Sequence, residues 1–80
     1  ELSRKAYRAL ENLSVNLRRR ILEKIMELRD NPFPKGSIKI RGEKDIYRLR
    51  VGDYRILYKA LWDEGAMLVF KIEHRRAVYG

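Results

Sequence analysis

The chain has 80 residues, of which 19 are lysine or arginine and 11 are aspartate or glutamate, giving a formal net charge of +8. This length suits one domain, and no apolar run approaches the roughly 20 residues of a membrane span or resembles a signal peptide. Absence of cysteine excludes disulfides and thiolate chemistry, and a single histidine excludes a histidine-rich metal site. We therefore expect one cytoplasmic domain over residues 1–80, without metal or cofactor.

The excess of positive charge points to a polyanionic partner. Such a balance on a short chain is typical of proteins that bind nucleic acid, an acidic protein, or both. Charge that only serves solubility is the alternative. The two interpretations differ in whether the basic residues are gathered on one surface.

Two amphipathic helices are predicted first. Apolar residues recur at helical spacing over residues 2–13 and again over 17–28. Ser14 is a suitable N-cap for the second helix, and the Pro-containing segment 31–34 ends it, because proline donates no backbone hydrogen bond and disfavours helix in the preceding residue. The triplet Arg18-Arg19-Arg20 could form a nucleic-acid or membrane patch, but acidic residues one turn later favour a solvated face.

The periodicity then changes to that of β-strands. Gly52-Asp53 separates two alternating runs and suits a type II′ hairpin turn, and Asp63-Glu64-Gly65 marks another turn. The extended segments expected are residues 37–42, 46–51, 54–59 and 67–72. The predicted fold class is α+β, with an N-terminal αα-hairpin packed on one face of a small antiparallel β-sheet.

The predicted hairpin sorts its side chains onto two faces, because side chains alternate along a strand. One face carries the apolar and aromatic side chains of residues 47, 49, 51, 54, 56 and 58 and should pack on the helices. The other face pairs Arg50 with Arg55 and Arg48 with Leu57. Opposed like charges destabilise a sheet, and arginine binds phosphate bidentately, so we expect three solvent-facing guanidinium groups to form a phosphate site. The alternative is a solubilising face whose arginines are splayed apart by sheet twist.

The residues after the last predicted strand could bring proton-transfer groups to this site. They are His74, Arg75, Arg76 and Tyr79. Histidine titrates near neutrality, and neighbouring positive charges favour the phenolate form of tyrosine. On residue types alone, a surface histidine and a packed tyrosine are the alternatives.

The run YRLRVGDYRILY over residues 47–58, followed by HRRAVY over residues 74–79, resembles the RelE/ParE toxin superfamily, and RelE more than ParE. The helix pair and the proline loop fall in the family's order, so the resemblance covers nearly the whole chain. It implies a toxin of a type II toxin–antitoxin system, silenced by a small RelB-like antitoxin whose acidic character would suit this basic chain. RelE-type members cleave messenger RNA at the ribosome, using the RNA's own 2′-hydroxyl as nucleophile.

The resemblance also implies roles for residues of the hairpin. Arg48 and Arg50 fall on the family's basic positions and would bind the RNA backbone, and Arg55 falls on the arginine after the turn and would stabilise the transition state. The implied activity is that of a metal-independent endoribonuclease.

In the tail, Tyr79 falls on the family's C-terminal tyrosine. Tyr79 or His74 would take the proton from the 2′-hydroxyl. Arg75 or Arg76 would supply the basic residue before the tyrosine and assist Arg55.

Two other functions stay open: a ParE-like toxin that binds and poisons DNA gyrase without cutting RNA, and a non-catalytic RNA-binding module. Assignment of the hairpin tyrosines to the core leaves no obvious exposed stacking platform, which argues against the second. The sequence also departs from the family at its start. Members usually open with a strand, whereas Glu1-Leu2-Ser3 stands where that strand would be ending, so one strand is either missing or cut short.

Overall fold

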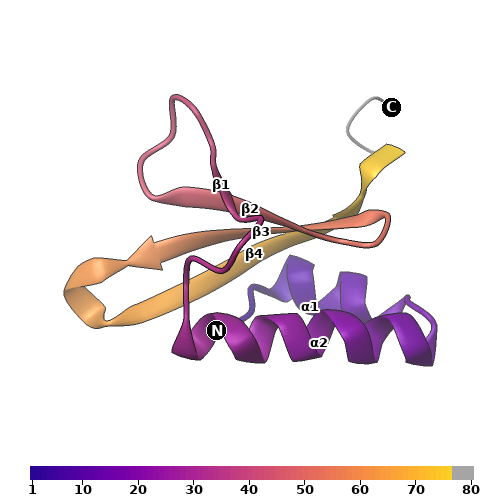
Figure 1. The fold of residues 1–80 in the computed structure, drawn as a ribbon. Helices are drawn as coiled ribbons and strands as arrows, with labels where there is room; N and C mark the ends of the chain where they lie inside the picture. Colours follow the sequence, from indigo (N-terminus) through magenta and orange to yellow (C-terminus); the bar gives the residue numbers. More distant parts are fainter. Residues whose placement is uncertain (77–80) are drawn as a thin grey trace.

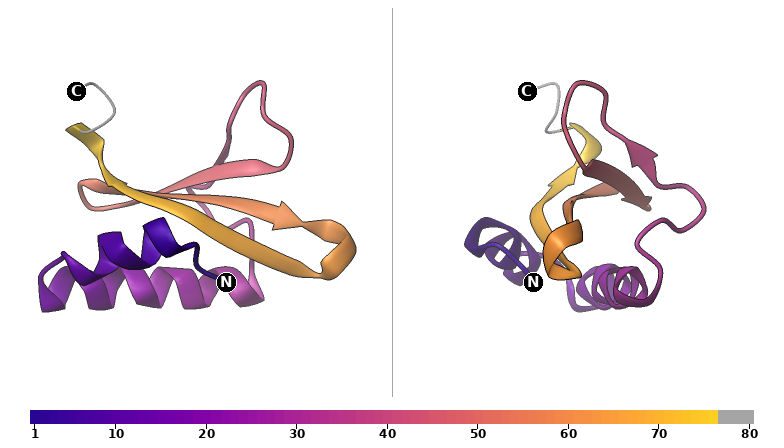
Figure 2. Two further views of the ribbon diagram at one scale, coloured as in Figure 1. Left: turned by 180° about the vertical axis from the view of Figure 1, so that it is seen from behind. Right: turned by 90° about the vertical axis from the view of Figure 1, so that its left-hand side faces the viewer.

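The computed structural model describes residues 1–76, apart from the side chain of Trp62, and residues 77–80 lie outside the described part. Within these residues the chain forms two helices and a four-stranded antiparallel sheet. Both helices lie on the same side of the sheet (Figures 1 and 2). The predicted α+β arrangement is confirmed. No helix in the described part is long and apolar enough to cross a membrane.

The helices are α1, Arg4–Glu11, and α2, Val15–Asp30. Ser14 caps α2 as predicted, because its hydroxyl accepts the backbone N–H three residues later at 3.3 Å. α1 begins at Arg4 rather than at residue 2, since Ser3 is its N-cap and accepts an N–H in the same way at 3.1 Å.

Arg18 joins the two helices. Its guanidinium donates to three carbonyl oxygens at the end of α1 and just beyond it, from Nε to Leu10 at 3.0 Å and from Nη2 to Glu11 and Leu13, both at 3.1 Å. The Leu10 carbonyl also accepts the Leu13 N–H at 3.1 Å, so Arg18 adds to the backbone bonds that close this helix end. The basic triplet is therefore not one surface patch, since Arg18 is a capping residue while Arg19 is exposed.

The sheet has the order β1-β2-β3-β4, with all neighbours antiparallel. Its strands are β1, Ile38–Lys39; β2, Ile46–Val51; β3, Tyr54–Leu61; and β4, Ala66–His74. β1 is shorter than the predicted extended segment, whereas β3 and β4 are longer than predicted. Gly52 has a φ of +59°, whereas the φ of Asp53 is not positive, as expected for the predicted type II′ turn. A 3₁₀ turn, Trp62–Glu64, connects β3 to β4.

The core lies between the helices and the sheet face predicted to meet them. Buried side chains of that face and of both helices form one cluster: Ala6, Leu10, Ile21, Leu28, Leu49, Val51, Ile56, Tyr58, Val69 and Ile72. Tyr58 is fully buried, and its hydroxyl donates to the Pro32 carbonyl at 2.7 Å. Burial raises the pKa of Tyr58 above its ordinary value. The hydrogen bond from Tyr58 to Pro32 fixes the proline loop against the sheet.

The first three residues run beside β4. Val69 donates to the Glu1 carbonyl at 2.8 Å, Ser3 donates to the Val69 carbonyl at 2.9 Å, and Leu2 forms a parallel bridge with Val69. A short parallel segment therefore occupies the edge of the sheet where a missing or shortened strand was expected. It also leads directly into α1, which packs against β4.

Candidate functional site

Two rows of side chains cross the face of the sheet that points away from the helices. The predicted pairing of β2 with β3 is confirmed, and β4 extends each row by one residue. The first row is Arg50, Arg55 and Glu73, and the second row is Arg48, Leu57 and Lys71. We call these the charged rows. Four cations and one carboxylate therefore share a small area of this face.

A β-bulge brings the β4 members of the rows onto this face. Leu57 pairs with Lys71 but Tyr58 pairs with Val69, so Phe70 is an extra residue between two regular ladders. If the pairing of Tyr58 with Val69 continued without a bulge, Lys71 would face the core and Glu73 would lie on the helix side. The Phe70 carbonyl accepts a hydrogen bond from the Ser3 hydroxyl at 3.0 Å.

Lys71 and Glu73 were not among the predicted site residues. The available signal was that Val69 and Ile72 are both apolar and three residues apart, and the structure buries both. Strict alternation would place residues three apart on opposite faces. Because nearly every residue from 67 to 72 is apolar, this signal is weak.

Arg55 departs from its predicted environment. We expected a solvent-facing guanidinium, but Arg55 is only 9% exposed, so that part of the prediction is wrong. The reason is that β3 is a central strand, and side chains of β2 and β4 flank Arg55 on both sides. Its Nε is buried without a hydrogen-bond partner among the described residues. A buried donor on a cation is costly unless it is paired, so this position suits an anionic ligand.

The other members of the rows are more accessible. Arg50 is exposed and Arg48 is half-buried. Glu73 has a side chain that is 14% exposed, and its Oε2 lies 3.2 Å from Nζ of Lys71. The carboxylate is thus held by a neighbour on its own strand and stands in register with Arg55.

The tail begins beside the hairpin turn. The Arg75 N–H donates to the Asp53 carbonyl at 2.8 Å, so the end of β4 lies near the first row, as predicted. His74, however, pairs with Tyr54, and their rings meet edge to face at 5.1 Å, on the side of the helices. The His74 Nδ1 accepts the Arg76 N–H at 3.1 Å.

The structure therefore brings Arg48, Arg50 and Arg55 together but places the His74 ring on the opposite face. Arg75 and Arg76 are exposed just beyond β4. Tyr79 lies outside the described residues.

Arg20 contributes charge near the same turn. A Cβ on Gly52 would lie 3.6 Å from Nη2 of Arg20, which shows that this α2 side chain rests against the turn. Arg20 was predicted to lie on a solvated helix face. The contact between Arg20 and the turn depends on how α2 packs under the sheet, which could not be predicted from the sequence.

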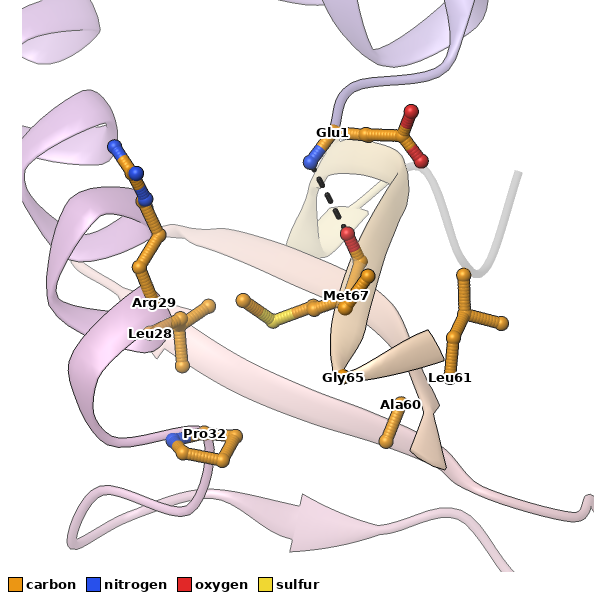
Figure 3. A pocket seen from close by; sticks show the side chains of 9 residues that line it. Glu1, Leu28, Arg29, Pro32, Ala60, Leu61, Gly65 and Met67 are labelled. Carbon is orange, nitrogen blue, oxygen red and sulfur yellow. Dashed lines mark hydrogen bonds between the residues drawn. The ribbon is translucent and has the colours of Figure 1, made fainter. Parts of the chain in front are cut away.

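A cavity of about 520 Å³ lies at the other end of the sheet (Figure 3). It is bounded by the end of α2 and by the region where β3 passes into β4, and Met67, whose carbonyl accepts from the Glu1 nitrogen at 3.1 Å, forms one side. None of the predicted site residues lines it. The cavity and the charged rows are thus separate features.

Comparisons with known proteins identify the family of the chain. A family model described as the ParE toxin of the type II toxin–antitoxin system parDE matches residues 1–79. A protein of Methanocaldococcus jannaschii, named as a candidate toxin RelE1, is 29% identical over 82 residues, which cover 99% of this chain and 91% of that protein.

Solved structures show the same fold. A chain of the RelB–RelE antitoxin–toxin complex from Methanococcus jannaschii has a TM-score of 0.80 at 23% identity, with 98% of this chain and 93% of that chain covered. A chain of the archaeal RelE–RelB complex from Pyrococcus horikoshii has a TM-score of 0.78 at 29% identity, with 92% of this chain and 90% of that chain covered. The isolated E. coli RelE toxin has a TM-score of 0.81 at 19% identity, with 99% of this chain and 93% of that chain covered. The chain therefore belongs to the RelE/ParE superfamily of type II toxin–antitoxin toxins.

Proposed function

We propose that this toxin is an endoribonuclease that cleaves messenger RNA at the ribosome through the RNA's 2′-hydroxyl, without a metal ion. The observation that carries the proposal is the first row, where the buried Arg55 has a donor without a partner and faces the exposed Arg50. Two like charges in register are unfavourable in the free protein, and a phosphate would relieve both the repulsion and the unpaired donor.

The hairpin arginines have different proposed roles, according to how far each is exposed to solvent. Arg48 and Arg50, which solvent reaches, bind and orient the RNA backbone. Arg55 stabilises the charge that develops on the phosphorus centre, because a buried cation acts there in an environment with little competing water. Arg75 or Arg76 assists, since β4 delivers the tail beside the hairpin turn.

Proton transfer is assigned to Tyr79, the position that matches the family's C-terminal tyrosine. His74 is the second candidate, although its ring packs on Tyr54 on the helix side. A general acid or base of this kind contributes about 10²- to 10⁴-fold to the rate. Dependence on a 2′-hydroxyl makes the substrate RNA rather than DNA.

The proposed partners follow from the charge and from the relatives. The M. jannaschii and P. horikoshii structures are complexes with RelB. An acidic RelB-like antitoxin suits a chain of net charge +8, and a partly disordered one could fold across it. Because ribosomes carry the substrate, the site of action is the cytoplasm.

Two substitutions test the residue roles in a ribosome-dependent cleavage assay read by primer extension. Tyr79→Phe should abolish cleavage and spare RNA affinity, since it removes only a hydroxyl. Arg50→Ala should weaken both, because it removes a phosphate ligand. Arg19→Ala, on an exposed position of α2, is the matched control. If both site variants cut RNA like the parent, with and without ribosomes, the assignment is wrong.

A second candidate function is supported by the family model, which describes ParE toxins. In that case the protein would bind and poison DNA gyrase, and the charged rows would serve as a docking surface. Induction in cells separates the two: breaks within codons of messenger RNA support the nuclease, whereas DNA damage with intact messenger RNA supports gyrase poisoning.

A further inference from the structure

The proposed cleavage, on which this inference rests, requires two proton transfers. The 2′-hydroxyl loses a proton while its oxygen forms a bond to phosphorus. The bond between phosphorus and the 5′-oxygen breaks, and that oxygen gains a proton. A tyrosine with an ordinary pKa of about 10 is protonated at neutral pH and is therefore better suited to donate a proton than to accept one. One acceptor is still needed.

Glu73 is the carboxylate of the charged rows. It stands in register with Arg55 on the neighbouring strand, and strands of a sheet lie only about 4.8 Å apart. A phosphate bound by Arg55 would consequently bring the adjoining ribose close to the Glu73 carboxylate. Hydrogen-bond reach of the proton is the first requirement for a general base.

The surroundings of Glu73 hold its carboxylate in place. Lys71 holds it at 3.2 Å from the same strand, Arg55 faces it from β3, and Arg50 lies one strand further. On the other side of β4, the parallel segment of residues 1–3 lies beside Val69 and Phe70 and does not extend as far as Glu73. With 14% of its side chain exposed, the carboxylate is largely shielded from water.

A carboxylate at this place weakens a site that serves only to bind phosphate, because it repels the anion. The bulge at Phe70 nevertheless brings Glu73 out of the helix side and onto the arginine face. Proton transfer gives this arrangement a chemical use. We propose that Glu73 is the general base that takes the proton from the 2′-hydroxyl, while the departing 5′-oxygen takes its proton from a separate general acid.

The test compares Glu73→Gln with the parent in single-turnover cleavage of ribosome-bound messenger RNA. Affinity is measured separately with an RNA oligonucleotide that carries 2′-O-methyl groups and cannot be cut. Cleavage should fall by about 10²- to 10⁴-fold, with affinity unchanged or increased because a repelling charge is gone. Glu73→Asp should retain part of the activity. Glu23→Gln, an exposed carboxylate on α2, is the matched control and should change neither quantity.

A pH series provides a readout that a structural role would not move. The parent's rate should rise with unit slope on the acid side and then level off, and Glu73→Gln should lose this dependence. Glu73→Asp, which keeps a carboxylate, should retain the dependence at a lower rate. The profile of the parent needs no Glu73 variant and stands if Glu73→Gln fails to fold.

Two outcomes overturn the inference: cleavage by Glu73→Gln at the parental rate, or a parental acid limb that Glu73→Gln leaves in place. A parent protein that cuts no RNA with or without ribosomes would instead refute the proposed nuclease function itself. The two failures are therefore distinguishable in one set of experiments.

Discussion

At the scale of single residues, Arg55 combines low exposure with an unpaired donor and a like charge opposite. Arg55→Met keeps an unbranched apolar stem at this buried position and removes both the unpaired donor and the like charge. We expect the free energy of unfolding to stay the same or rise by about 1 kcal/mol, because a buried unsatisfied donor is lost. RNA affinity should fall by roughly tenfold to a hundredfold, since a charged hydrogen bond contributes about 1.5–3 kcal/mol.

Urea unfolding and binding of 2′-O-methyl RNA measure the two effects. Arg8→Met, on the exposed face of α1, should alter neither. A loss of several kcal/mol in Arg55→Met would mean that the guanidinium has a structural partner and is not poised for a ligand.

The pairing of Arg50 with Arg55 was predictable from sequence, whereas the burial of Arg55 was not. A two-residue turn at Gly52-Asp53 fixes the register of a hairpin, so the opposite residues follow by counting. Burial depends on a third strand, and therefore on contacts between residues distant in sequence. The same holds for Glu73, which reaches Arg55 through β4.

At the scale of elements, the side chain of Arg18 on α2 links this helix to the end of α1. Arg18→Ala removes three hydrogen bonds to carbonyl groups at the end of α1. We expect the free energy of unfolding to fall by about 2 kcal/mol, because hydrogen bonds from charged groups are stronger than average.

Arg19→Ala is the control in the next position, and an exposed substitution of this kind changes stability by about 0.5 kcal/mol or less. Equal unfolding midpoints of the two variants in urea would show that the caps at Leu10, Glu11 and Leu13 contribute nothing.

The elements themselves followed from local signals, and the exceptions have local causes. Ser14 and the proline segment placed α2 correctly, because caps and breakers act through adjacent residues. The start of α1 was misplaced, since Leu2 continues the apolar spacing but pairs with Val69 of β4. The bulge at Phe70 was missed for a similar reason, because a uniformly apolar strand conceals a change of face.

At the scale of the whole molecule, a net charge of +8 attracts RNA from every side, and the charged rows should nevertheless dominate binding. Each cation that neutralises a phosphate of a single strand steepens the decline of log K with log salt by about 0.7. Arg48→Gln should therefore reduce the slope by about 0.7, because Arg48 belongs to the second row.

Arg19→Gln removes the same charge from α2, on the side of the sheet away from the rows (Figure 1). It should lower affinity slightly and leave the slope unchanged, since a distant charge acts only through a screened field. Titration of 2′-O-methyl RNA at several salt concentrations measures both variants. Equal reductions in slope would mean that the chain binds RNA through charge spread over its surface, and that the sheet provides no particular path for the phosphates.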